Sequence, residues 1–211
     1  MKAKRITIAA LTLLPLIVGL IALSFLPDEI PAHYGINLTV DRFGSKYESL
    51  ITPFIALFFG IIFVIASLVP KKEQTKKLSL NIGLAFMLTF NAFDFCILYI
   101  QANNVVALDE SPLRFDSVSM LIIGCLLIFL GNIMPMSRRN AFFGLRTPWS
   151  LKNDNVWKKS QIFGGASMII VGLICAALAF VYPNLFVMLG LVVLTAVIDT
   201  VYTYIIAKNN G

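Results

Sequence analysis

Six almost purely apolar stretches, each about 20 residues long, limit the fold of this chain more than any other feature. At a rise of 1.5 Å per residue, a helix of that length crosses the roughly 30 Å hydrocarbon core of a bilayer. A β-barrel would need alternating segments of ~10 residues, whereas these stretches are continuous. We therefore predict an all-α integral membrane protein with one transmembrane domain, whose spans are about 6–26, 51–70, 79–100, 117–136, 161–181 and 184–206.

The charged residues predict how the chain is oriented. Only 13% of residues are charged and 58% are hydrophobic, whereas an ordinary soluble domain is about a quarter charged. All but three of the 17 lysines and arginines lie before the first stretch or after the second, fourth and sixth. Because basic residues collect on the cytoplasmic side, both termini are predicted to be cytoplasmic. The net charge of +6 then reflects topology, and we expect no direct binding of nucleic acid.

Two extracellular loops follow from this orientation. The prolines of the first loop, 27–50, hold the chain extended, and Ser45 and Glu48 have the spacing of a capping box at the start of the second span. We expect this loop to be ordered. The second loop, 101–116, carries three acidic residues against one arginine. Its charge would attract a cationic partner, or it simply reflects the scarcity of basic residues outside.

The cytoplasmic loop 137–160 mixes basic and aromatic residues with turn formers. Trp149 and Trp157 suit a belt at the level of the lipid headgroups, which is common in membrane proteins. Alternatively, the loop is folded and seals the bundle or docks a partner. Turn-forming residues support this second interpretation, namely Asn140, Gly144, Thr147 and Pro148.

Two aspartates fall inside predicted spans, where ionisable residues are costly and are candidates for function. Asp94 lies near Asn91 in the third span, and Asp199 lies in the sixth. They could form interhelical hydrogen bonds or serve proton-coupled transport. Intramembrane proteolysis would need two facing carboxylates at one depth, and these two are predicted on opposite sides of the midplane.

The usual signatures of catalysis and metal binding are missing from the sequence. His33 is the single histidine and has no cysteine or carboxylate cluster at metal-ligand spacing around it. The sequence contains no P-loop, nucleophile elbow or zinc-protease motif. We therefore expect no catalytic residue, metal site or cofactor, and no enzymatic activity.

Two segments together resemble the bacterial SdpI-type immunity proteins, which are named for the sporulation-delaying toxin system. The first is Leu-Pro-Asp-Glu-Ile-Pro-Ala-His-Tyr-Gly at 26–35, followed by Asp-Arg-Phe-Gly-Ser-Lys at 41–46. The second is Leu-Gly-Asn-Ile-Met-Pro at 130–135, followed by Asn-Ala-Phe-Phe-Gly-Leu-Arg-Thr-Pro-Trp at 140–149 and Val-Trp at 156–157. The second segment is the more specific.

The resemblance implies a multi-pass protein of the bacterial cytoplasmic membrane that protects its producer from a secreted peptide toxin. It also implies a signal to a cytoplasmic transcriptional repressor. Expected partners are thus the lipid bilayer, the toxin and the repressor. The main alternative is a small proton-coupled transporter or exporter that uses Asp94 and Asp199. The outer-loop candidates for toxin binding are His33, Tyr34, Asp41, Arg42 and Lys46, and the signature-loop candidates are Asn132, Pro135, Asn140, Gly144, Arg146, Thr147, Pro148, Trp149 and Trp157.

Overall fold

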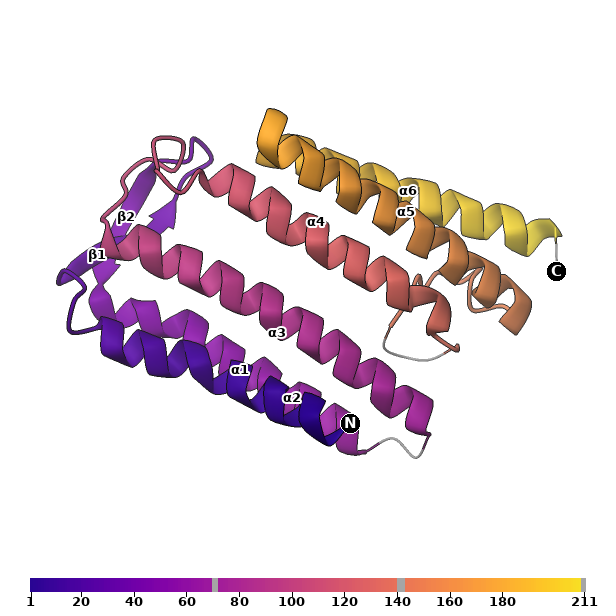
Figure 1. Ribbon diagram of the computed structural model, residues 1–211. Helices are drawn as coiled ribbons and strands as arrows, with labels where there is room; N and C mark the ends of the chain where they lie inside the picture. Colours follow the sequence, from indigo (N-terminus) through magenta and orange to yellow (C-terminus); the bar gives the residue numbers. More distant parts are fainter. Residues whose placement is uncertain (70–71, 140–142, 210–211) are drawn as a thin grey trace. The chain divides into compact units, whose positions relative to one another are not determined.

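The computed structural model describes residues 1–69, 72–139 and 143–209 (Figure 1). Six helices in this part of the chain are long and apolar enough to cross a membrane, which confirms the predicted helical fold. They are α1 Lys2–Ala22, α2 Ile51–Leu68, α3 Glu73–Ala102, α4 Phe115–Ile133, α5 Asp154–Val181 and α6 Leu185–Asn209. Large apolar side chains such as Ile17, Phe58 and Val193 are exposed on these helices, as expected of surfaces that face lipid.

Two helices begin at least six residues earlier than the apolar stretches that predicted them. α3 begins at Glu73 and α5 begins at Asp154, because polar residues add helical turns before the apolar part. Glu73 forms an ion pair with Lys77 one turn later, at 3.2 Å. The side chain of Asn153 caps α5 by accepting a hydrogen bond from the Val156 N–H at 2.9 Å.

The chain divides into two compact units, residues 1–118 and 119–211. In the N-terminal unit, α1, α2 and α3 pack against one another (Figure 1). Their core contains Ile8, Ala56, Leu80 and Met87. Small residues allow the close approach, since a Cβ on Gly60 of α2 would overlap the Thr12 side chain of α1.

A β-hairpin lies at one end of the N-terminal unit. β1 Glu29–Tyr34 pairs in antiparallel fashion with β2 Val40–Ser45, and a 3-10 helix, η1 Lys46–Leu50, leads into α2. The predicted first extracellular loop, 27–50, is thus ordered, but it contains two paired strands. The all-α prediction is correct for the six long helices and wrong for this loop. The predicted capping box forms only in part. The Ser45 hydroxyl makes no cap hydrogen bond, but the Glu48 carboxylate accepts one from the Ser45 backbone N–H. Glu48 also accepts two hydrogen bonds from Arg42.

The second loop, which connects α3 and α4, packs against the hairpin. The Val40 N–H donates to the Val106 carbonyl at 2.8 Å, and the Leu108 N–H donates to the Leu38 carbonyl at 2.9 Å. We call residues 28–48 and 103–108 together the hairpin platform. It is one structured surface built from both predicted extracellular loops.

In the C-terminal unit, α4 and α5 meet backbone to backbone. A Cβ on Gly131 of α4 would lie 2.5 Å from the Gly165 carbonyl oxygen of α5, and one on Gly124 would lie 2.7 Å from the Gly172 oxygen. Such glycine pairs let membrane helices approach closely. α6 packs beside α5 (Figure 1), and the 3-10 helix η2 Met134–Met136 follows α4. Residues 137–153, which join η2 to α5, are called the signature loop below.

Candidate functional site

The signature loop folds back onto α5 through a buried glutamine. The Leu145 N–H donates to Gln161 Oε1 at 2.9 Å, and Gln161 Nε2 donates to the Leu145 carbonyl at 3.1 Å. Gln161 is fully buried. Leu145 thus satisfies both the donor and the acceptor of the Gln161 side-chain amide. The Gln161 side chain pairs with the loop backbone in the way that a neighbouring β-strand would.

Gly144 permits this contact with Gln161. Its φ of 116° belongs to a region that residues with a Cβ rarely adopt. A Cβ at this position would overlap Gln161 Oε1 and approach the Trp157 ring. The glycine predicted from the motif is therefore required by backbone conformation and by space.

Trp157 lies inside the C-terminal unit. Its side chain is 2% exposed, and Nε1 donates a hydrogen bond to the Ser137 carbonyl at 2.8 Å. This environment favours the folded-loop interpretation over a headgroup belt for Trp157. Trp149 differs, because it is 37% exposed and packs edge-on against Tyr204 with ring centroids 5.3 Å apart.

A turn at Thr147 and Ser150 ties the loop to α6. The Thr147 N–H donates to Ser150 Oγ at 2.9 Å, and the Ser150 N–H donates to Thr147 Oγ1 at 3.0 Å. Thr147 Oγ1 also shares a hydrogen bond of 2.8 Å with Thr203 Oγ1. Each of the two side chains accepts a hydrogen bond from the backbone N–H of the other residue. Through Gln161 and Thr203, the loop is therefore attached to both α5 and α6.

The outer rim of the signature loop is basic. Arg139 bonds the Leu151 carbonyl and pairs with Asp154 at 3.1 Å. The side chains of Arg146, Lys152 and Lys158 are exposed, and none forms a hydrogen bond or ion pair within the described part of the chain. This rim offers positive charge to an acidic partner or to lipid phosphates.

The remaining signature-loop candidates contribute less to this arrangement. Asn132 is exposed and donates to the Ile128 carbonyl of its own helix at 2.8 Å. Pro135, in η2, is exposed and packs near Gly165, and Pro148 is exposed in the turn. Asn140 lies outside the described residues.

Hydroxyl groups of neighbouring helices bind both aspartates of the predicted spans. Asp94 of α3 accepts a hydrogen bond from Thr52 of α2, and Asp199 of α6 accepts from Ser167 of α5 at 2.8 and 3.0 Å. Asn91 donates to the Leu11 carbonyl of α1 at 2.9 Å. These contacts support the interhelical hydrogen-bond interpretation, and each joins helices of one unit.

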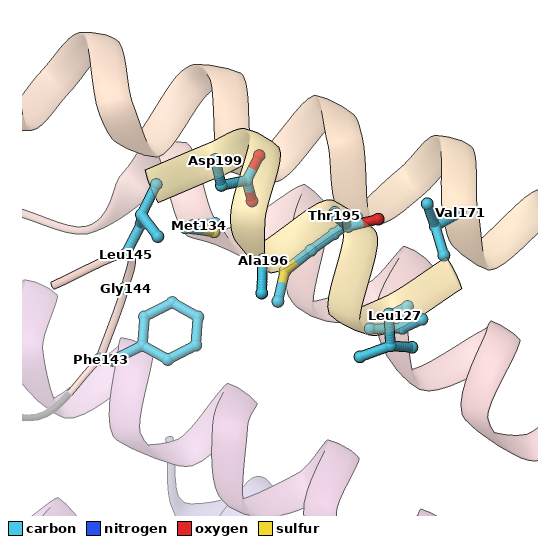
Figure 2. Close-up of a pocket in the computed structure, with 11 residues that line it drawn as sticks. Leu127, Met134, Phe143, Gly144, Leu145, Val171, Thr195, Ala196 and Asp199 are labelled. Atoms are coloured by element: carbon cyan, nitrogen blue, oxygen red, sulfur yellow. The ribbon is translucent and has the colours of Figure 1, made fainter. Parts of the chain in front are cut away.

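A cavity of about 390 Å³ opens between the signature loop and the three helices of the C-terminal unit. Figure 2 shows Leu127 of α4, Val171 of α5 and Asp199 of α6 around it, with the loop residues 143–145 at one end. Its walls are mostly apolar. Asp199 thus belongs to a cavity as well as to an interhelical hydrogen bond.

The predicted outer-loop residues form exposed pairs on the hairpin platform. His33 Nδ1 lies 2.6 Å from Asp41 Oδ1, and Lys46 lies 2.8 Å from Asp28. The hydrogen bond and charge of Lys46 hold the pKa of Asp28 below its ordinary value. Tyr34 donates its hydroxyl to the Val105 carbonyl, and burial raises the pKa of that hydroxyl to about 12.

Arg42 and Glu48 form the third pair, with their closest atoms 2.9 Å apart. The hydrogen bond to Arg42 holds the pKa of Glu48 below its ordinary value, and the same bond raises the pKa of Arg42. The structure therefore joins each of the five outer-loop residues to a neighbour within the platform.

Sequence reasoning missed three residues that fix the signature loop, one of which lies within the loop itself. Gln161, Ser150 and Thr203 hold it in place, yet none stands out in a recognisable motif. The available signal was a polar side chain at the end of an apolar stretch, as at Gln161. Such residues are expensive unless bonded, and that cost could have singled them out.

Comparison with known proteins places the signature loop within a family match. Residues 136–203 match the SdpI/YfhL protein family, and residues 10–57 match a domain of unknown function, DUF1648. The Immunity protein SdpI of Bacillus subtilis (strain 168) is 28% identical over 204 residues, which cover 95% of this chain and 94% of that protein. No solved structure matches. The resemblance predicted from the two motifs is confirmed.

Proposed function

We propose that this chain, which resembles the SdpI-type immunity proteins over nearly its whole length, is a membrane immunity protein. In this proposal it lies in the bacterial cytoplasmic membrane and protects its producer from a secreted antimicrobial peptide. The observation that carries the proposal is the 28% identity to an immunity protein over 95% of the chain. The segregation of basic residues supports an orientation with both termini in the cytoplasm.

The hairpin platform is the proposed receiving surface for the toxin. It is a structured surface at the predicted outer side, and apolar side chains are exposed on it beside paired charges. Ile36, Phe43, Tyr47 and Val106 are all more than 45% exposed. An amphipathic peptide could bury apolar groups there while its charges meet those of the platform.

The outer-surface proposal is tested by growth under toxin challenge. Cells that express the His33→Ala or Asp41→Ala protein at matched level are expected to lose protection, because each variant removes an exposed polar side chain from the surface that would receive the toxin. Glu73→Ala is the matched control, since it removes an exposed carboxylate at the opposite end of the same unit. Undiminished protection in both platform variants would count against toxin binding at this surface.

The signature loop is the proposed docking surface for a cytoplasmic repressor. Its backbone is fixed by buried hydrogen bonds, and Arg146 and Trp149 present an exposed cation and an exposed aromatic ring. Rigid aromatic and arginine side chains often dominate protein interfaces.

Recruitment of the repressor to membranes tests this assignment. Arg146→Ala and Trp149→Ala are expected to reduce the membrane-bound fraction of repressor in toxin-exposed cells. Lys208→Ala serves as the control, because it removes another basic side chain near the end of α6. If both loop variants keep normal recruitment and normal protection, the loop is not the docking surface.

A transporter remains the second candidate because Asp199 adjoins a cavity. Purified protein in liposomes would then move a labelled toxin peptide down a pH gradient, and Asp94→Asn or Asp199→Asn would abolish the flux. Protection without any flux in wild-type liposomes would favour immunity by binding.

A further inference from the structure

The cavity of the C-terminal unit has the composition of a ligand site. Apolar side chains from three helices and the signature loop line most of it, including Leu127, Met134, Phe143 and Val171. The polar groups in the lining come from α6, where Thr195 and Asp199 lie one turn apart (Figure 2). Binding sites for small molecules have this character, with a mostly apolar wall and a few placed polar groups.

Asp199 is the chemically distinctive group of the lining. It is 5% exposed, and Ser167 is its hydrogen-bond partner among the described residues. That hydroxyl is neutral, so the carboxylate has no cation beside it in this part of the chain. A buried carboxylate gains most from a partner that brings positive charge and excludes water.

We infer that this cavity binds a small apolar molecule that carries one cationic amine. The ammonium group pairs with Asp199, and the hydrocarbon body lies along Leu127 and Val171. A cavity of about 390 Å³ is within the size range of small-molecule sites. The inference goes beyond the proposed immunity function, because it requires neither a toxin nor a repressor.

The ligand would also touch the signature loop. Phe143, Gly144 and Leu145 form one end of the cavity, and Gln161 holds Leu145 by two hydrogen bonds. A bound molecule adds contacts to this loop segment in its observed position. Occupancy therefore stabilises the folded loop by mass action.

Direct binding of 4-phenylbutylamine tests the inference. Tritium-labelled amine is added to the full chain in phosphatidylcholine nanodiscs, and the signal from empty nanodiscs is subtracted. Saturable binding is expected. The neutral analogue 4-phenylbutanol has the same apolar body, so it is expected to compete at least about tenfold less well than unlabelled amine. Equal competition by the two compounds, or no saturable binding, would overturn the inference.

Variants locate the binding within the chain. Asp199→Asn is expected to weaken amine binding at least about tenfold, because it removes the charge and keeps the shape. Asp94→Asn is the matched control, since Asp94 is an intramembrane carboxylate that does not line the cavity, and it should bind normally. Equal affinity of the Asp199→Asn protein and the wild type would overturn the inference.

A cavity-filling variant keeps the inference testable if Asp199→Asn fails to fold. Ala196 lines the cavity and is itself exposed, so Ala196→Phe should fold while it occupies the space. It is expected to weaken amine binding at least about tenfold with the carboxylate intact. Unchanged binding in Ala196→Phe would show that the amine binds elsewhere.

Discussion

The hairpin platform and the signature loop are both structured connections, but they are held together in opposite ways. The platform uses exposed pairs, such as His33 with Asp41 and Arg42 with Glu48. The signature loop uses buried groups, above all Gln161 and Trp157, which are nearly or fully excluded from solvent. One region is stabilised at its surface and the other from its interior.

This difference predicts which substitutions should reduce stability. Exposed ion pairs contribute little to stability because water screens them, so either partner can change at small cost. A buried polar group that loses its partner keeps the full cost of its removal from water. We therefore expect the platform to tolerate changes that vary its surface chemistry and the signature loop to tolerate few.

The largest expected effect is that of Gly144→Val. The new side chain forces a φ of 116° on a β-branched residue and overlaps Gln161, so the free energy of unfolding should fall by about 3 kcal/mol or more. Unfolding in an SDS titration, followed by circular dichroism, measures this change. Gly190→Ala is the control, because nothing lies within 4 Å of its added Cβ. If the Gly144→Val protein is as stable as the wild type, the signature loop does not depend on this glycine.

Trp157→Phe should have the next largest effect. The phenyl ring keeps most of the apolar contact but leaves the Ser137 carbonyl without its indole donor, at a cost of about 1–2 kcal/mol. The same SDS titration applies, with Trp149→Phe as the exposed counterpart. If the two variants lose equal stability, burial is not what distinguishes the loop.

Glu48→Gln on the platform should leave the midpoint of SDS unfolding unchanged within error. Its half-buried carboxylate pairs with the exposed Arg42 at the surface, so solvation of both groups replaces most of the lost attraction. The titration is run beside Trp157→Phe. A loss as large as in that variant would mean that the platform, too, depends on its side-chain pairs.

Acidification should produce a local change that is confined to the platform. The pKa values of Asp28 and Glu48 lie below their ordinary values of 3.8 and 4.5. Their stabilisation is therefore complete above those ordinary values and is lost as the pH falls through the lowered pKa values. Limited proteolysis below about pH 4 should cleave residues 29–45 faster, and residues 143–153 at an unchanged rate. Faster cleavage of the signature loop instead would mean that the signature loop, and not the platform, depends on charged pairs.

Hydropathy predicted the six helices well because the bilayer imposes one length and one composition on every span. It could not predict the polar turns that begin α3 and α5, since the Glu73–Lys77 pair and the Asn153 cap carry no hydropathy signal. Helices continue past the apolar part wherever local polar contacts satisfy the backbone.

The hairpin was missed because its turn lacks a familiar signature. Leu38 adopts a φ of 61° in the turn, where glycine or asparagine is usual. The capping box formed only in part. Glu48 bonds the Ser45 backbone N–H as its spacing predicts, but the Ser45 hydroxyl makes no cap bond, and Arg42 of β2 also binds the carboxylate. Spacing along the chain does not reveal this contact from the strand.

The motif of the signature loop predicted important residues without their partners. Gly144, Thr147 and Trp157 were all identified from sequence, yet each acts through a residue outside the motif or its turn. Those contacts arise only when α5, α6 and the loop come together. The sequence therefore identifies loop residues that matter for the structure, but it does not identify the residues that they contact.

The glycine pairs between α4 and α5 also have an evolutionary consequence. Each of Gly124, Gly131, Gly165 and Gly172 faces backbone of the other helix at under 3 Å from the place of a Cβ. Every substitution open to a glycine adds atoms, so drift at these four sites can move in only one direction, toward a poorer fit. Compensation would require two helices to separate along their whole contact. We expect homologous lineages to keep these positions while their platforms diverge.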